Sequence, residues 1–306
     1  MPTYEIVVST ENNHYLVWQA MLFHASCIRH LGQAPVIMVH THDQPLLPGF
    51  DRIREKGGRI QTAPDYRRIQ GVNYPPRNTA ASLRHVQTDA DYIVLCDPDM
   101  VFLQPLSWDD WKLTDQQITF DHVGYLDASL PQYQPTVDEV CRQAGIDPSR
   151  LRNPNTNGGV PHVIPARHQR GLSDLWLEFI ELFPNCAPCS PDDPGARPRE
   201  CHIGPQKDWL STMWGLIMAA DRLGLEAVLT RFCISTGHGE LPLPAVTPGS
   251  PSLIHYCYRS PGFHKHQFDT AEAADRDVWH VPADDGSICG NVRRQLHEAC
   301  EFYGLS

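Results

Sequence analysis

Hydrophobic and polar positions alternate in blocks along the first hundred residues. Short apolar runs, typical of buried strands, are separated by stretches whose apolar residues recur at helical spacing. The predicted strands are 5–9, 35–40, 59–62 and 92–96, and the predicted helices are 15–31, 50–56 and 79–87, with Gly32 as the C-cap of the first helix. Strands that alternate with helices form βαβ units, so this third of the chain is predicted to fold around a largely parallel sheet.

The remainder of the chain has a less regular pattern, without an internal repeat or a long linker. The predicted strands are 118–123, 160–164, 227–234 and 252–258, and the predicted helices are 137–144, 171–183 and 208–223. A polar, aromatic and His-rich tail follows Phe263. We expect this tail either to fold over a site or to form a solvated end.

The charge balance excludes some classes of partner. The 306 residues carry 25 Lys+Arg against 36 Asp+Glu, a net charge of −11. That balance argues against nucleic-acid binding, which needs a basic surface, and against docking on anionic lipid. No apolar run reaches the roughly 18 residues of a membrane span, and the start lacks the basic and apolar regions of a signal peptide. We therefore expect a cytoplasmic protein with no membrane span; the sequence leaves its oligomeric state open.

Seven of the ten cysteines fall into two kinds of setting. Four lie in apolar runs and are predicted to be small buried residues: Cys27, Cys96, Cys233 and Cys257. Another group lies in a Pro-rich stretch: Cys186, Cys189, Cys201 and His202. Its spacing is compatible with a structural zinc site, a disulfide or free thiols, and the sequence leaves all three open.

The most informative segment is the end of the predicted strand 92–96. The carboxylates Asp97 and Asp99 follow that apolar run directly, separated by Pro98. In an open α/β sheet, ligands gather at the carboxyl ends of the strands, and paired carboxylates there suit Mg²⁺ or Mn²⁺. Two other Asp-x-Asp pairs occur in the chain, but neither follows a buried strand. The alternative is a solvated turn whose bend is set by Pro98.

A second segment with matching chemistry follows a late strand. His255 could complete a metal shell, Gly262 would allow close backbone approach, and Lys265 could pair with phosphate. The alternative is that His255 is a hydrogen-bonded strand residue and Lys265 a surface cation.

Together these residues resemble the GT-A type of nucleotide-sugar glycosyltransferase, with a late segment similar to the His…Gly-x-x-Lys element of glycogenin-like enzymes. A closer likeness is to the hydroxyproline O-arabinosyltransferase and peptidyl-serine galactosyltransferase group. The matching stretches, in order within about residues 6–268, are 13–19, 74–81, 96–105, 208–214, 220–225 and 253–256. Met100 stands where that group has His, and Thr212 where it has Glu.

The resemblance implies an α/β fold with a GT-A-like Rossmann-type mixed sheet flanked by helices, in a single large domain 1–306. Residues 1–106 would form the nucleotide-sugar-binding half, and residues 107–306 the acceptor half, with the C-terminal tail closing the site. The implied reaction is metal-dependent hexosyl or pentosyl transfer, with retention, from a UDP-sugar to a hydroxyl of a peptide, glycan or small molecule. With Thr212 in place of the acid, front-face attack is favoured over a carboxylate nucleophile.

The resemblance also implies roles for individual residues. Asp97, Asp99 and His255 would hold Mn²⁺ or Mg²⁺, with Asp97 also near the ribose, and Lys265 would hold the diphosphate. On the donor side, Thr10, Glu11 and Asn12 would lie near the base and ribose, and Arg77 and Asn78 would approach the donor. Gly262 would allow the backbone to approach the nucleotide sugar closely. The alternatives are a polar loop for 10–12 and a helix cap for 77–78.

On the acceptor side the chain offers a polar turn, 155–159, containing Asn157, whose amides could bind sugar hydroxyls. The alternative is a hairpin-type turn. Asp121, His122 and Asp208 are candidates for sugar contacts or for the group that faces the anomeric carbon. Trp209 and Trp214 are expected in the core rather than against a sugar.

Two other function classes stay open at this stage. A sugar nucleotidyltransferase also pairs an α/β sheet with strand-end acids, but it should carry a Gly-rich basic loop after its first strand, and residues 9–14 are not such a loop. A non-catalytic interaction protein could be built around a zinc-bound Cys186–His202 segment.

Overall fold

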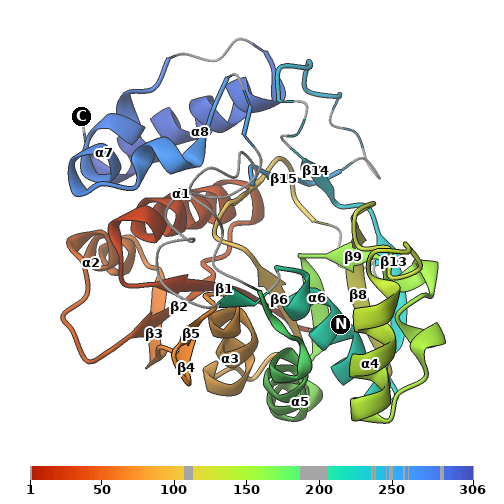
Figure 1. The fold of residues 1–306 in the computed structure, drawn as a ribbon. Helices are drawn as coiled ribbons and strands as arrows, with labels where there is room; N and C mark the ends of the chain where they lie inside the picture. The colour runs from red at the N-terminus through yellow and green to blue at the C-terminus, as the bar shows by residue number, and fades with distance from the viewer. Residues whose placement is uncertain are drawn as a thin grey trace. The chain divides into compact units, whose positions relative to one another are not determined.

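The computed structural model describes residues 2–106, 113–186, 206–207, 209–235, 237, 239–245, 247, 251–257, 259–260, 262–282 and 286–305 (Figure 1). The chain divides into two compact units that are interleaved along the sequence. Unit 1 contains Met1–Thr3, Pro64–Ile93 and Leu113–Thr230, and unit 2 contains Tyr4–Ala63, Val94–Lys112 and Arg231–Ser306. Strand β6 (Tyr92–Cys96) crosses the division.

The main sheet of unit 2 is made of strands from the first hundred residues, most of them apolar and buried. Its strand order is β6, β1 (Tyr4–Glu11), β2 (Val36–Thr41) and β3 (Arg59–Pro64), and β1 and β2 are parallel. These strands alternate with helices α1 (His14–Leu31) and α2 (Pro48–Glu55). As the sequence predicts, α1 ends at Gly32, whose φ of 64° is the left-handed conformation that glycine adopts readily.

A smaller sheet in unit 2 joins the middle of the chain to its last third. Strand β15 (Leu253–His255) lies between β14 (Cys233–Ser235), to which it is parallel, and β7 (Met100–Phe102), to which it is antiparallel. The tail continues through the short 3₁₀ helix η6 (Lys265–Phe268), α7 (Ala271–Asp275) and η7 (Asp277–His280).

The tail ends in α8 (Ile288–Tyr303), which packs against α1 and buries an apolar face. The alternative of a solvated tail is therefore wrong. Two capping signals mark this helix: the Ser287 hydroxyl accepts a hydrogen bond from the Gly290 amide at 2.8 Å, and Gly304 closes it in the left-handed conformation.

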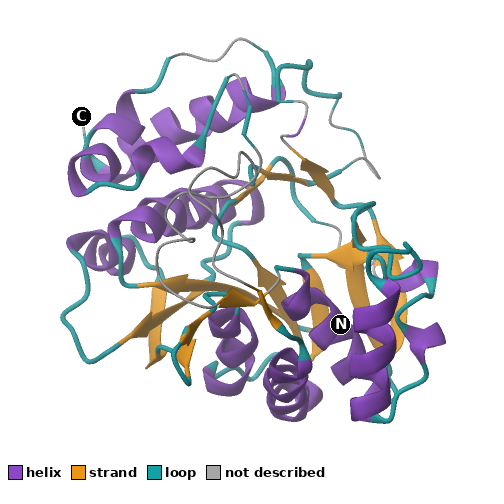
Figure 2. Cartoon of the chain, viewed as in Figure 1, coloured by secondary structure: helices purple, strands orange, loops and turns teal. Residues whose placement is uncertain are grey.

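Unit 1 pairs helices with short strands (Figure 2). Strand β8 (Gln117–His122) lies between β13 (Glu226–Thr230), which is parallel to it, and β9 (Gly158–Gly159), which is antiparallel; β10 (His162–Pro165) lies beside β6. Helix α5 (Gln169–Leu182) packs against α3 (Arg77–His85) and α6 (Leu210–Arg222). The remaining elements are β4 (Arg68–Ile69), β5 (Val72–Asn73), α4 (Gln134–Ala144), η2 (Pro148–Arg150), η3 (Pro154–Thr156), η4 (Ala166–His168), β11 (Asn185–Cys186) and β12 (Gln206–Lys207).

The predicted mixed α/β class, with sheets flanked by helices, is confirmed. One predicted strand, 227–234, is wrong: β13 ends at Thr230 and pairs with β8 in unit 1, whereas β14 begins at Cys233 and pairs with β15 in unit 2. The division at residue 106 stays a prediction. Among the residues that the structure describes, no helix is long and apolar enough to cross a membrane.

A buried histidine in unit 1 makes stability depend on pH. The imidazole of His162 is 5% exposed, packs edge-on against Phe120, and its Nδ1 lies 3.0 Å from the Thr119 carbonyl oxygen. Burial lowers the pKa of His162 to about 4, from 6.5. Between pH 6.5 and pH 4 the unfolded chain therefore binds a proton on this imidazole, whereas the folded chain does not. The contribution of neutral His162 to the free energy of unfolding is fully present above pH 6.5 and is lost as the pH is lowered toward 4.

We expect the free energy of unfolding to fall by up to about 3 kcal/mol per such histidine over that range. Urea unfolding at pH 7 and pH 4.5 measures the effect. His162→Gln should lose less stability than wild type between the two pH values, and a replacement of exposed His280 by Gln should lose as much as wild type. An equal loss in His162→Gln and wild type would contradict the assignment.

Candidate metal site

The site lies in unit 2, where the short strands β7 and β15 pair in antiparallel register. The chain leaves β6 at Cys96, passes through Asp97, Pro98 and Asp99, and enters β7 at Met100. His255, the last residue of β15, is the register partner of Met100. The next amide along, that of Tyr256, donates a hydrogen bond to the Asp99 carbonyl oxygen at 2.9 Å. This pairing brings an imidazole to two carboxylates that are 156 or more residues away in the chain.

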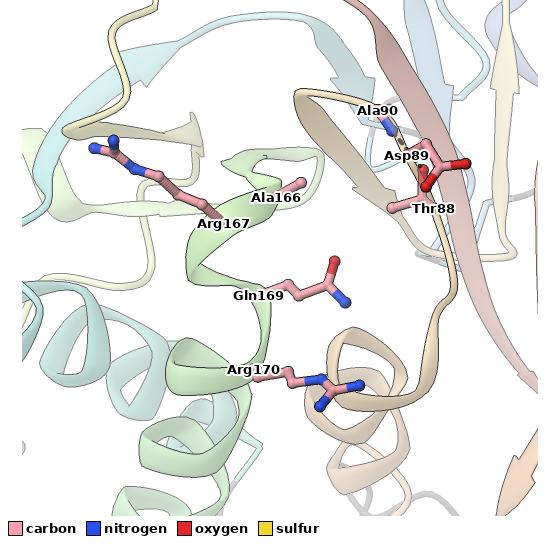
Figure 3. A pocket seen from close by; sticks show the side chains of 7 residues that line it. All are labelled: Thr88, Asp89, Ala90, Ala166, Arg167, Gln169 and Arg170. Atoms are coloured by element: carbon pink, nitrogen blue, oxygen red, sulfur yellow. Dashed lines mark hydrogen bonds between the residues drawn. The ribbon is translucent and has the colours of Figure 1, made fainter.

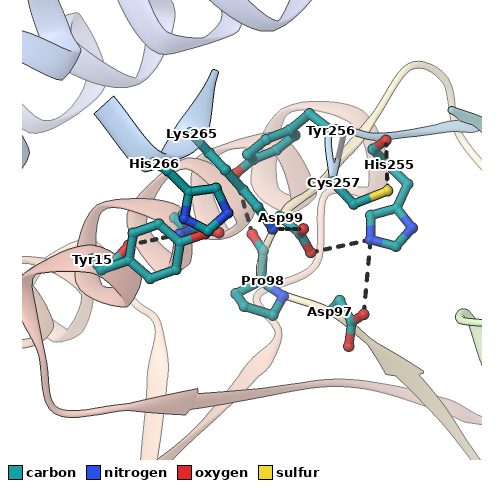
Figure 4. Close-up of polar contacts among 10 residues, drawn as sticks. Tyr15, Asp97, Pro98, Asp99, His255, Tyr256, Cys257, Lys265 and His266 are labelled. Carbon is teal, nitrogen blue, oxygen red and sulfur yellow. Dashed lines mark hydrogen bonds and ion pairs between the residues drawn. The ribbon is translucent and has the colours of Figure 1, made fainter. Parts of the chain in front are cut away.

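The three predicted metal ligands converge (Figure 4). His255 Nε2 lies 3.2 Å from Asp99 Oδ1 and 3.8 Å from Asp97 Oδ2. Each of the three residues offers a ligand atom within 4.8 Å of the others. The Asp99 side chain is 7% exposed, whereas those of His255 and Asp97 are 20% and 28% exposed. The cluster therefore has a buried base and an accessible side.

Lys265 supplies the positive charge of the cluster. Its Nζ forms an ion pair with Asp99 Oδ2, and its side chain is 11% exposed. Burial opposes the charge on both groups, but their mutual attraction outweighs it, so the pKa of Asp99 is lowered and that of Lys265 is raised. Likewise, burial disfavours protonated His255, but Asp99 raises its pKa well above the usual value.

Asp97 differs from Asp99 in its electrostatics. Burial and the neighbouring Asp99 charge raise the pKa of Asp97 to about 6, against the opposite effects of His255 and Lys265. The charge of Asp99 is thus compensated by Lys265. The charge of Asp97 is disfavoured by its surroundings, and a bound cation would stabilise it. Two carboxylates and one imidazole are a donor set that fits Mn²⁺ or Mg²⁺.

Tyr15 and Trp18 of α1 hold the segment that carries Lys265, a role that the sequence did not predict for them. Tyr15 stacks on His266 with ring centroids 5.1 Å apart, and its hydroxyl lies 3.4 Å from His266 Nε2. One turn further along α1, Trp18 Nε1 donates to the Phe268 carbonyl oxygen at 3.0 Å. The two aromatic residues therefore fix both ends of η6, which carries Lys265. The aromatic and His-rich character of the tail was the available signal.

The predicted nucleotide loop, Thr10, Glu11 and Asn12, lies at the end of β1 in unit 2. Asn12 is engaged with the following loop: its Nδ2 donates to the Pro45 carbonyl oxygen at 2.8 Å and its Oδ1 accepts from the Leu47 amide at 2.9 Å. Glu11 Oε2 accepts a hydrogen bond from Asn13 Nδ2 at 3.1 Å. These contacts order the loop; contact with a nucleotide stays a prediction.

Arg77 and Asn78, predicted near the donor, have structural partners in unit 1. The Arg77 guanidinium is fully buried, binds Glu181 at 2.6 and 3.1 Å, and donates to the Val72 carbonyl oxygen at 2.9 Å. Asn78 Oδ1 accepts from the Tyr66 amide at 2.7 Å, and its Nδ2 donates to Asp65 at 2.9 Å. The structure thus gives both residues a role in holding α3 in its unit.

Gly262 also has a packing reason. A Cβ atom there would lie 2.9 Å from Arg293 Nη1 and 3.2 Å from the Cys289 Cβ atom, both on α8. Its carbonyl oxygen accepts a hydrogen bond from Arg293 Nη1 at 2.5 Å. Close approach to α8 therefore accounts for this glycine; approach to a phosphate stays a prediction.

The acceptor-side candidates meet in unit 1, where β8 pairs with β9. Asp121 is opposite Gly159, and exposed His122 is opposite Gly158, directly after Asn157. Asp121 is 3% exposed and its Oδ1 accepts from the Thr230 hydroxyl at 3.1 Å. Asp208 lies outside the described residues, as do Cys189, Cys201 and His202, so zinc, a disulfide and free thiols all stay open for that segment. The predicted core position of Trp214 is confirmed, because that residue is 2% exposed. The same prediction for Trp209 is wrong, because Trp209 is 48% exposed.

A surface hollow of about 410 Å³ in unit 1 contains none of the predicted site residues (Figure 3). It is lined by Thr88, Asp89, Ala90, Ala166, Arg167, Gln169 and Arg170. Arg167 is ion-paired with Asp115 at 2.9 Å. The hollow contains none of the residues of the Asp97, Asp99 and His255 cluster, so we do not assign it the reaction.

No family model matches this sequence, and no curated protein matches it. Among solved structures, the chain is similar to the galactosyltransferase LgtC in complex with donor and acceptor sugar analogues, with a TM-score of 0.50 at 10% identity over 89% of this chain and 95% of that one. It is also similar to the bifunctional glycosyltransferase WbbM in its apo form, with a TM-score of 0.50 at 10% identity over 97% of this chain and 52% of that one. At such identities the likeness shows the fold, which is that of these glycosyltransferase structures.

Proposed function

We propose that this protein is a metal-dependent glycosyltransferase that moves a hexosyl or pentosyl group from a nucleoside diphosphate, UDP in the first instance, to a hydroxyl acceptor. The observation that carries the proposal is the convergence of Asp97, Asp99, His255 and Lys265 at the end of β6. The fold shared with solved glycosyltransferases supports it, because these carboxylates lie at the strand end where such α/β folds bind ligands.

The chemistry required is stabilisation of a departing diphosphate. Asp97, Asp99 and His255 would hold Mn²⁺ or Mg²⁺, which supplies Lewis-acid neutralisation of the phosphate oxygens. Lys265 adds an ammonium that is held charged by Asp99 and fixed by η6. A preorganised charge in a partly buried site stabilises developing negative charge without reorganisation at the moment of reaction. These residues therefore give an acidic chain of net charge −11 a local means of binding a polyanion.

We further propose that transfer proceeds with retention, by front-face attack assisted by the leaving phosphate. Retention is what the resemblance implies, and front-face attack is favoured because Thr212, on α6, stands where the resembled group has a carboxylate. Met100 stands where the resembled group has His, and it is fully buried in β7, so we assign it no contact with the acceptor.

Nucleotide binding tests the proposal directly. We expect UDP with Mn²⁺ to raise the melting temperature more than UDP alone, Mn²⁺ alone, or the adenosine and guanosine diphosphates. A ligand at 100 times its dissociation constant stabilises the fold by about 2.7 kcal/mol, which is several degrees for a chain of this size. Thermal unfolding of the full chain measures the shift. If no nucleoside diphosphate gives a metal-dependent shift, the proposed function is wrong.

A further inference from the structure

We propose that an exposed aromatic surface of unit 1, formed by Tyr125, Trp209 and Met213, binds a sugar ring of the acceptor. This inference rests on the proposed function, because it assigns the chemical class of that reaction's acceptor to carbohydrate. The residues come from two segments of unit 1, the loop after β8 and the first turn of α6.

The exposure of the two aromatic side chains is the first observation. Trp209 is 48% and Tyr125 is 42% exposed, and among the residues that the structure describes only Leu241 joins them as an exposed large hydrophobic side chain. Aromatic side chains carry a large apolar area and are usually buried, so two of them exposed on one unit mark a candidate binding surface.

Met213 joins the two aromatic residues into one surface. The Tyr125 hydroxyl lies 4.0 Å from Met213 Sδ. Met213 follows Trp209 by four residues, and Trp209 already has helical φ and ψ, so both side chains lie on one face of the first turns of α6. Gly159 makes room for this arrangement, because a Cβ atom there would lie 3.1 Å from Met213 Cε.

The backbone beneath Trp209 is fixed although its indole is exposed. The hydroxyl of Tyr74, which is 2% exposed, donates to the Trp209 carbonyl oxygen at 2.9 Å and accepts from the Thr212 amide at 2.9 Å. A surface aromatic residue on a fixed base loses little conformational freedom on binding, which favours a ligand-binding role over a side chain exposed by chance.

A polar group beside this surface distinguishes a sugar from an apolar partner. Asn157 Oδ1 is buried and has no hydrogen-bond partner among the described residues. The Asn157 carbonyl oxygen accepts from the Val123 amide at 3.0 Å, which places Asn157 next to the segment that carries Tyr125. A pyranose presents C–H groups to an aromatic face and hydroxyl donors to an amide oxygen. A flat apolar partner, such as a second copy of this chain, would offer that oxygen no donor, whereas a sugar hydroxyl can supply the hydrogen bond that it lacks.

Saturation-transfer NMR of the full chain tests the inference. The probes are methyl glucoside, galactoside, mannoside and xyloside, each in both anomeric forms. We expect transfer from the protein to the C–H protons of at least one probe. In Trp209→Ala that signal should fall at least fivefold, while Trp209→Phe should retain most of it. Leu241→Ala is the matched control, since Leu241 is equally exposed, and should leave the signal unchanged.

Absence of transfer to every probe in wild type, or equal transfer in Trp209→Ala, would overturn the inference. Tyr125→Ala, outside the helix, serves as a second variant with the same expected loss if Trp209→Ala alters folding. Dimerisation of wild type that Trp209→Ala abolishes would also overturn it, in favour of a second copy. The UDP-dependent thermal shift should be unchanged in Trp209→Ala, so failure of the sugar site and failure of the proposed function give different results.

Discussion

Replacement of Asp99 by Asn should, on the proposed function, lower turnover of a nucleotide-sugar donor at least about 100-fold, which corresponds to about 2.7 kcal/mol of transition-state stabilisation. The amide keeps the shape of the side chain and an oxygen for Lys265, but it removes the charge that a metal ligand and the Lys265 ion pair both need. Steady-state assays at saturating Mn²⁺ measure the loss.

Asp99→Ala and Asp89→Asn are the variants to compare with Asp99→Asn. Asp99→Ala should also unfold more easily, because it leaves the buried Lys265 ammonium without its carboxylate. Asp99→Asn keeps an oxygen that can accept from Lys265, so it should lose less stability than Asp99→Ala, and urea unfolding of both variants measures the difference. Asp89, exposed and part of another Asp-x-Asp pair, is the matched control, and Asp89→Asn should keep wild-type turnover. Turnover of Asp99→Asn within threefold of wild type would remove Asp99 from the metal site.

Replacement of Arg77 by Met should lower the free energy of unfolding by about 3 kcal/mol. The guanidinium is fully buried and binds the Glu181 carboxylate and two carbonyl oxygens, those of Arg67 and Val72. Met fills much of the volume but supplies no donor, so the Val72 carbonyl oxygen and the Glu181 carboxylate lose the guanidinium as their partner. Urea unfolding of the full chain measures the change.

Arg84 is a matched control on the same helix. Both arginines lie on α3 and pair with carboxylates on α5, but Arg84 and its partner Asp174 are 52% and 55% exposed. An exposed pair contributes little, so Arg84→Met should change stability by less than about 0.5 kcal/mol. If the two variants lose equal stability, the structural role given to Arg77 is incorrect.

Local chemistry made much of the fold predictable. The apolar run of β6, the helical spacing of α1 and its Gly32 cap depend on neighbouring residues only, and each appears where the sequence predicts it. The same rules could have identified α8, since Ser287 and Gly304 cap it. It was missed because polar and His-rich residues around it obscured the buried face.

Long-range pairing accounts for what was wrong or missed. The apolar run 227–234 reads as one strand, but its halves pair with β8 and β15 in different units. Residue identity shows that Arg77 is basic, not that its charge is buried against Glu181. Both outcomes depend on which distant segment lies alongside, and no local periodicity contains that information.

For the site, the sequence by itself determined the chemistry: two carboxylates after a buried strand, and an imidazole and an ammonium in a later segment. Only the tertiary structure decided that they meet. The antiparallel register of β7 and β15 sets His255 beside Asp99, and the stacking of η6 on α1 directs Lys265 to the same carboxylate. Ligand identity is a property of side chains, whereas coordination geometry depends on strand register and packing between segments far apart in the chain.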